Sequence, residues 1–166
     1  MALFNPIEKI SSMKLSDYAT GVPDPKNPDK RLESTFCTMV EEHIPGFGGI
    51  GGTPALKFGM YWNKTEKKYV WWNVKNLNEK NQLTRILETA KIKNPTVDDA
   101  WNVVRSELVR MLKAGQDFQK DGDVEKFSEI DILGTISSHV RSKFMAIYFP
   151  NHCLDIHGRQ YLKDLS

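Results

Sequence analysis

The sequence lacks most of the features that mark a secreted, disulfide-stapled or membrane-spanning protein. It has only two cysteines in 166 residues, Cys37 and Cys153, and they lie far apart along the chain. We therefore expect both thiols to be reduced, as is usual in cytoplasmic proteins. No run of 18 apolar residues is present to form a membrane-spanning helix, and the first ten residues lack the apolar segment of a signal peptide. These absences predict a cytoplasmic protein with no membrane partner.

The chain also lacks a nucleotide-binding signature, although it has a glycine-rich loop. Five of the seven residues from Gly46 to Gly52 are glycine. A Walker A loop requires G-x-x-x-x-G-K-[ST] ahead of a helix, but Thr53 and Pro54 follow here, and then a strand-like run. The strand–turn–helix context of a dinucleotide fingerprint is missing too. Two interpretations stay open, a tight structural turn or a concavity of backbone N–H groups that holds a phosphate. Neither predicts a bound cofactor.

A nuclease motif is matched only superficially. Pro28-Asp29 followed by Glu66-x-Lys68 has the residue order of a metal-dependent nuclease. Such enzymes hold Mg²⁺ between carboxylates on rigid strands, whereas here the aspartate falls in a proline-rich arm and the glutamate in a turn. We therefore predict that the chain is not an enzyme.

A zinc site is equally weakly supported. His152, Cys153 and His157 supply three potential ligands near the end of the chain. Structural zinc sites normally use four ligands with paired spacing. We predict no metal site.

What the sequence does have is an uneven distribution of charge. The whole chain carries a formal net charge of +2. The segment from Lys57 to Lys93 contains nine basic and three acidic residues, which gives it a net charge of +6. A local excess of basic residues favours an anionic partner such as a nucleic acid, although a solvated lysine-rich surface has the same composition.

An aromatic hairpin lies inside this basic segment. Strand-like runs at about 56–63 and 68–75 are joined by the polar turn 64–67. Because neighbouring residues of a strand point to opposite faces, one face of each strand should join the core: Phe58, Met60 and Trp62 on the first, and Val70, Trp72 and Val74 on the second. The other face would present a ribbon of Lys57, Tyr61, Tyr69, Trp71, Asn73 and Lys75. A pairing shifted by one residue would invert this assignment.

Helical periodicity and boundary residues predict the remaining elements. After an irregular arm at about 12–30, punctuated by three prolines, we expect helices at about 31–43, 79–92, 97–114 and 135–148. Gly115 is predicted to end the third of them. The length suits one domain, residues 1–166. The expected fold is α+β, with a small antiparallel sheet around the hairpin at about 56–75 packed against four or five helices. An all-helical fold with one hairpin is the alternative.

The order of several short motifs is similar to that of a known family. Thr35-Phe36-Cys37 is followed by Glu42, then by the glycine loop, then by Lys57-Phe58-Gly59-Met60-Tyr61. Further on come a helix that starts Val97-Asp98-Asp99-Ala100, then Phe149-Pro150 and Leu154-Asp155-Ile156. Over residues 30 to 165 the chain resembles the N-terminal region of McrB-like AAA+ restriction proteins.

That resemblance implies a DNA-recognition domain of a phage-defence system. In this family the N-terminal domain binds DNA, often with modified bases, and acts with a nucleotide-hydrolysing AAA+ ring and a separate nuclease subunit. The present sequence has no Walker A, Walker B or sensor motif, so it would be the isolated recognition domain. The partners expected are double-stranded DNA, the parent ring and the nuclease subunit.

From the residues and this resemblance we predict the side chains that contact DNA. Lysines would neutralise phosphates, and an aromatic ring would stack on a base, including one flipped out of the duplex. The predicted DNA-binding residues are Lys57, Tyr61, Lys67, Lys68, Trp71 and Lys75. Two alternatives stay open: a protein-interaction or oligomerisation module of a defence complex, with a partner covering the hairpin, and a module that stacks unpaired RNA bases.

Overall fold

Most of the residues that the structure describes lie in helices, and the other regular elements among them are two small hairpins. The computed structural model describes residues 6–43, 58–71, 82–121, 136 and 138–149. Its helices are α1 (Pro6–Ser11), α2 (Leu15–Tyr18), α3 (Phe36–Thr38), the π-helix η1 (Met39–His43), α5 (Gln82–Thr89), α6 (Val97–Asp121) and α8 (Ser138–Tyr148). Its strands are β1 (Pro23–Asp24), β2 (Asn27–Arg31), β3 (Met60–Asn63) and β4 (Lys68–Trp71), which pair as two antiparallel hairpins. The predicted α+β class is confirmed.

The long helix α6 organises the other helices, and its start is well capped. The backbone N–H and hydroxyl of Thr96 donate to Oδ2 of Asp99 at 2.8 and 2.6 Å, and the Asp99 N–H donates back to Oγ1 of Thr96 at 3.2 Å. This reciprocal arrangement satisfies N–H groups that the first helical turn leaves without partners. These hydrogen bonds hold the pKa of the Asp99 carboxyl below its usual value. The predicted start of this helix at Val97 is therefore confirmed.

The predicted end of the same helix is wrong. α6 does not stop at Gly115 but continues to Asp121. Gly115 is buried inside the helix, and a Cβ there would lie 2.2 Å from Cε2 of Phe149. The glycine allows close packing of the residue that follows α8, rather than a change of backbone direction. The residues after the predicted end are thus helical as far as residue 121.

The core lies where α6 meets the other helices. Its residues on α6 include Trp101, Val104, Leu108, Met111 and Leu112, as the helical spacing predicts. They pack with residues of α1, α2, α5 and α8, among them Ile10, Tyr18, Leu87, Val140 and Phe144. Helix α1 packs along α6 although no helix was predicted there. The core is thus built on α6, which positions the hairpins relative to the helices.

The segment expected to be an irregular arm, about 12–30, contains regular structure. It holds α2 and the hairpin β1–β2, whose turn is closed by the Lys26 N–H donating to Oδ1 of Asp24 at 2.8 Å. The next helix begins at Phe36 and not at Arg31, because Arg31 pairs in β2 and Oγ1 of Thr35 accepts the Thr38 N–H at the helix start. Two prolines occupy strand positions in this short hairpin, which has no central strand.

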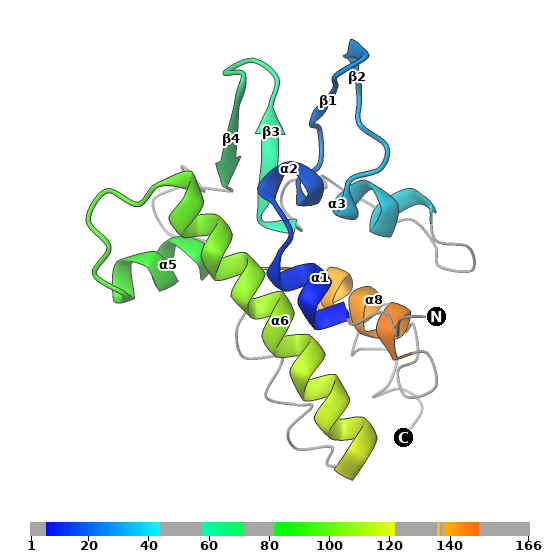
Figure 1. Cartoon of the computed structure of the whole chain (residues 1–166). Coiled ribbons are helices and arrows are strands. Elements are labelled where there is room, and N and C mark those ends of the chain that lie inside the picture. The colour runs from blue at the N-terminus through cyan, green and yellow to red at the C-terminus, as the bar shows by residue number, and fades with distance from the viewer. Residues whose placement is uncertain (1–5, 44–57, 72–81, 122–135, 137, 150–166) are drawn as a thin grey trace, which may run out of the picture.

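Both hairpins project from the same side of the helices (Figure 1). A parallel bridge between Thr20 and Tyr61 joins the segment before β1 to β3, and the Trp62 N–H donates to the Thr20 carbonyl at 2.9 Å. Helix α6 packs against β4 from below. The two hairpins are therefore joined to each other through Thr20 and Tyr61, and both project from the helical part of the fold.

Several predictions fall on residues outside the described part of the chain. They concern the glycine loop 46–52, Lys57, Trp72, Lys75 and the zinc candidates near residues 152–157. Within the described residues, no helix is both long and apolar enough to cross a membrane, and no group of three or more histidine, cysteine, aspartate or glutamate residues is placed to hold a metal ion.

Candidate nucleic-acid interface

The turn of the hairpin β3–β4 is shaped by Asn63. Its Oδ1 accepts hydrogen bonds from the N–H groups of Thr65 and Glu66, at 3.0 and 3.1 Å. Its Nδ2 donates to Oε1 of Glu66 at 3.2 Å. Lys67 then takes a positive φ of 50°, a conformation that few non-glycine residues adopt. The predicted four-residue polar turn 64–67 is confirmed.

The tip of this hairpin carries exposed lysines. Lys64, Lys67 and Lys68 are all exposed, and Lys68 Nζ lies 2.6 Å from Oε2 of Glu66. The side chains of that ion pair are 61% and 50% exposed, so water screens their attraction and the pair stabilises the fold little. The predicted contacts Lys67 and Lys68 therefore lie together at the tip, accessible to an anion.

The predicted aromatic ribbon on one face is wrong. Met60 pairs with Trp71 and Trp62 with Tyr69, so these four side chains share one face. Tyr61 pairs with Val70 on the opposite face. Residues that pair directly lie on the same face, and a turn of four residues pairs an odd-numbered residue of one strand with an even-numbered residue of the other. The expected ribbon instead placed odd-numbered residues of both strands on one face. Tyr61 and Trp71, both predicted to contact DNA, thus point to opposite sides.

The aromatic face is buried at its base and more open towards the tip. Met60 is fully buried, and Trp71 is partly buried against the core. Further out, Trp62 and Tyr69 are only partly buried, and their rings meet edge to face with centroids 4.9 Å apart. Partial burial, with a smaller effect from Asp17, raises the pKa of the Tyr69 hydroxyl. Trp62, expected in the core, is only partly buried, whereas Trp71 is the tryptophan of this face that packs against the core.

The free edge of β3 is tied to the segment before β1. Tyr61 forms the bridge with Thr20, and the adjacent Gly21 has a φ of 77°. A Cβ on Gly21 would lie 3.2 Å from the Trp62 carbonyl oxygen. This close approach fixes the free edge of β3, which limits unwanted pairing with another strand.

The base of the hairpin is anchored by Tyr18. Its hydroxyl donates to the Phe58 carbonyl at 2.8 Å, and its ring lies 4.8 Å from the Trp101 ring and 5.7 Å from the Phe36 ring. Complete burial, followed by the nearby Cys37, raises the pKa of the Tyr18 hydroxyl. Tyr18 therefore holds the aromatic hairpin against both α3 and α6.

The sequence reasoning missed the hairpin β1–β2 as a possible contact. Lys26 and Lys30 are exposed on it, while Arg31 pairs with Glu33 at 3.3 Å. The Asp24-Pro25 step is a turn signal in the sequence. The strands that flank this turn are too short and polar to be recognised from alternation.

Buried charged residues support the helices below the hairpins. Lys143 on α8 is completely buried, and its Nζ donates to the Glu41 carbonyl of η1 at 3.4 Å. Burial lowers the pKa of the Arg141 guanidinium, and the charge of Glu107 on α6 opposes that shift. These groups lie in the interior where η1, α6 and α8 meet, so we assign them to holding the three helices together.

Comparison with known proteins gave no match: no family model, no curated protein and no solved structure is significantly similar to this chain. The similarity to McrB-like proteins thus remains a prediction from the sequence.

Proposed function

We propose that this chain is a DNA-binding recognition domain. The observation that supports this best is the hairpin β3–β4, which carries exposed lysines at its tip and a half-buried aromatic pair beside them. A second hairpin with Lys26 and Lys30 exposed projects on the same side (Figure 1). The basic tip of β3–β4 suits a partner with a regularly charged backbone, and β1–β2 adds two lysines beside it together with the exposed Asp29.

The lysines would supply the sequence-independent part of binding. Lys64, Lys67 and Lys68 lie at the tip, and only Glu66 within the turn offsets them. Neutralising phosphates releases counterions from DNA, so this contribution falls steeply as salt rises. Lys57 and Lys75, outside the described residues, belong to the same proposal.

The aromatic face would supply contact with a base. Trp62 and Tyr69 are the partly exposed rings nearest the tip, and stacking of a base on such rings tolerates chemical modification of the base edge. Trp71 lies closer to the core on the same face. We therefore move the proposed base contact from Trp71 and Tyr61 towards Trp62.

The sequence resemblance extends this proposal to a biological setting. The domain would read a modified base for a McrB-like restriction system and present the DNA to an AAA+ ring and a nuclease subunit. The alternative is a protein-interaction or oligomerisation module in which a partner covers the same hairpin. Met39, at 42% exposure, is a large hydrophobic side chain on the surface for such a partner.

The test is fluorescence anisotropy with labelled duplexes at low and moderate salt. The duplexes carry unmodified, methylated, hydroxymethylated or glucosylated cytosine, or N6-methyladenine, in one sequence. Tighter binding to one modified duplex supports a reader of that base, and equal, salt-dependent binding supports a general DNA-binding domain. No binding to any duplex contradicts the proposal and favours the protein-interaction alternative.

A further inference from the structure

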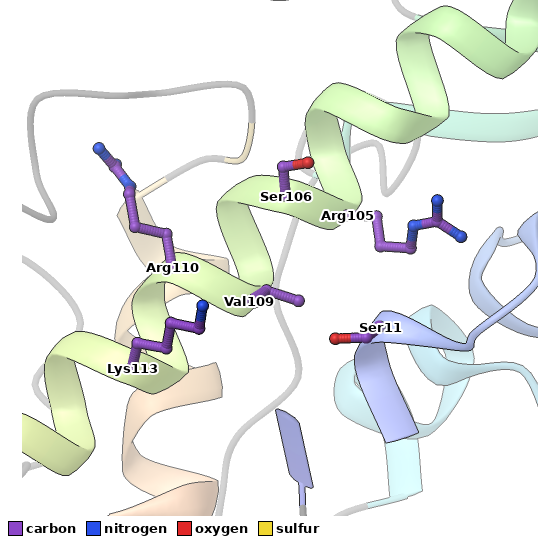
Figure 2. Close-up of a pocket in the computed structure, with 6 residues that line it drawn as sticks. All are labelled: Ser11, Arg105, Ser106, Val109, Arg110 and Lys113. Carbon is purple, nitrogen blue, oxygen red and sulfur yellow. The ribbon is translucent and has the colours of Figure 1, made fainter. Parts of the chain in front are cut away.

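An open cavity of about 430 Å³ lies between α1 and α6, and its polar lining is basic or neutral. Its lining residues are Ser11 of α1 and Arg105, Ser106, Val109, Arg110 and Lys113 of α6 (Figure 2). Three of the six are cations, two carry hydroxyl groups, and none is a carboxylate. This combination of charge and hydrogen-bond donors suits the oxygens of phosphate groups.

The cations are spread along the helix and do not converge on one point. Figure 2 shows Arg105 extending towards α1, Arg110 extending to the other side of α6, and Lys113 on the same helix beside Val109. Arg105 and Lys113 are eight residues apart, which corresponds to about 12 Å along a helix axis. A nucleic-acid strand places one phosphate about every 3.4 Å along its axis. The spacing therefore suits a chain of phosphates better than a single ion.

The two arginines of this cavity are held in different ways. Arg105 lies over the Trp101 ring at 5.8 Å, and its Nη2 donates to Oδ1 of Asn102 at 2.8 Å. Arg110 has a buried Nη2 with no hydrogen-bond acceptor in the part of the chain that the structure describes. The Arg110 side chain extends away from α1, so Arg105 and Lys113 are the cations assigned to an anion in the cavity.

The cavity is connected to the hairpin through buried aromatic contacts. Arg105 covers Trp101, the Trp101 ring contacts Tyr18, and Tyr18 bonds to the Phe58 carbonyl just before β3. Helix α6 also packs against β4. One rigid unit therefore carries both the aromatic face and the basic cavity.

We propose that Arg105 and Lys113 form a second surface for the phosphate backbone of a nucleic acid, with hydroxyl donors from Ser11 and Ser106. This inference rests on the proposed DNA-binding function, and it assigns that function a contact on the helical side of the molecule. The hairpin would contact a base, while α6 would hold the backbone of the same nucleic acid.

The test compares two double variants by anisotropy over a range of salt. In one, Arg105→Gln is combined with Lys113→Gln; in the matched control, Lys91→Gln is combined with Lys93→Gln. Both control lysines are exposed and neither lines the cavity, yet the same charge is removed. Each lost phosphate contact should reduce the salt slope by about 0.9, so the cavity variant should lose about 2 and bind at least about ten-fold more weakly. Thermal unfolding checks that both variants fold, and Lys113→Gln alone replaces the double variant if Arg105→Gln unfolds it.

The outcomes separate this surface from the function on which it rests. If the cavity variant binds like the control while Lys67→Ala with Lys68→Ala weakens binding, the α6 surface is overturned and DNA binding stands. If the wild-type protein binds no duplex, both proposals fall.

A free phosphate compound is the competing source of the same chemistry. To test this source, inorganic tripolyphosphate is titrated into the protein at constant ionic strength. Binding is followed by the NMR shifts of α6. Saturable binding at Arg105 and Lys113 that is tighter than binding of the duplex would overturn the assignment to nucleic acid. Weak shifts that the duplex exceeds at the same phosphate concentration would support it.

Discussion

Gly115 and Phe149 are in such close contact that no side chain fits between them. A Cβ at position 115 would lie 2.2 Å from Cε2 of Phe149 and 2.5 Å from its Cζ. Phe149 is only 3% exposed, so its ring is confined and has little space into which to move. This contact joins the C-terminal part of α6 to the residue that follows α8.

We predict that Gly115→Ala destabilises the protein. Alanine should gain about 1 kcal/mol from helix propensity, but overpacking typically costs about 1–3 kcal/mol and this overlap is severe. The net loss should lower the midpoint of urea unfolding. Combining Gly115→Ala with Phe149→Leu should recover part of the loss, since the smaller side chain relieves the overlap. Strictly additive losses in the two variants would contradict the contact.

This pair also shows how far the sequence could predict the fold. Periodicity and the capping residues placed the start of α6 and its core residues correctly, because one buried stripe begins there. Gly115, in contrast, has the sequence context of a helix end, and only the position of Phe149, distant in sequence, shows that it is a packing residue. Information of that kind is absent from local sequence.

The aromatic hairpin shows the same limit for the candidate site. Its two strands and polar turn were predicted from alternation, and the tip lysines followed from the turn. The side on which Trp62, Tyr69 and Trp71 lie depends on the pairing register, which the length of the turn sets. Because the pairing differs by one residue from the expected one, Tyr61 lies on the opposite face from Trp71, the other predicted aromatic contact.

A second prediction concerns the backbone at Lys67. Its φ of 50° costs a non-glycine residue on the order of 1 kcal/mol. Lys67→Gly should therefore leave stability unchanged or raise it slightly, while it weakens DNA binding by removing a tip charge. Lys64→Gly is the control, because Lys64 does not share the positive φ, and it should lower stability through loss of backbone entropy. A Lys67→Gly variant less stable than Lys64→Gly would refute this account.

A third prediction concerns the anchor of the hairpin. Tyr18→Phe removes the buried hydroxyl that donates to the Phe58 carbonyl, and leaves that carbonyl without this donor. Loss of such a bond should cost about 1–3 kcal/mol in the free energy of unfolding. Tyr148→Phe, at a less buried tyrosine, is the comparison and should cost less. Equal effects would show that the Tyr18 bond has no special role.

A fourth prediction follows from the buried thiol of Cys37. Burial raises its pKa well above 9.0, the ordinary value, while its interactions with the Tyr18 side chain and the Thr20 backbone oppose the shift. Above about pH 9 the unfolded thiol loses its proton and the folded one keeps it, so the unfolded state binds fewer protons. The free energy of unfolding should then fall by up to about 1.4 kcal/mol per pH unit from this group. The stability that the buried, protonated thiol contributes below pH 9 is therefore lost as the pH rises above that value.

The measurement for this prediction is urea unfolding between pH 7.5 and 10. Cys37→Ala should be less stable at neutral pH because it leaves a cavity, yet its stability should fall less steeply above pH 9. Curves for the two proteins that run parallel over the whole range would show that the thiol does not titrate in this way. Tyr18, whose pKa burial also raises, should contribute a further loss above about pH 10.

The final prediction separates the two faces of the hairpin. If a base stacks on the aromatic face, Trp62→Leu should weaken DNA binding by about 1–3 kcal/mol, the usual contribution of one stacked base. Tyr61→Leu changes a side chain of similar partial burial on the opposite face and should have a much smaller effect. Trp71→Leu should instead lower stability, since that ring packs against the core. Because all three substitutions remove an aromatic ring from the same hairpin, urea unfolding of each variant is measured beside its anisotropy titration. A larger loss of affinity in Tyr61→Leu than in Trp62→Leu, with both variants folded, would assign the base contact to the other face.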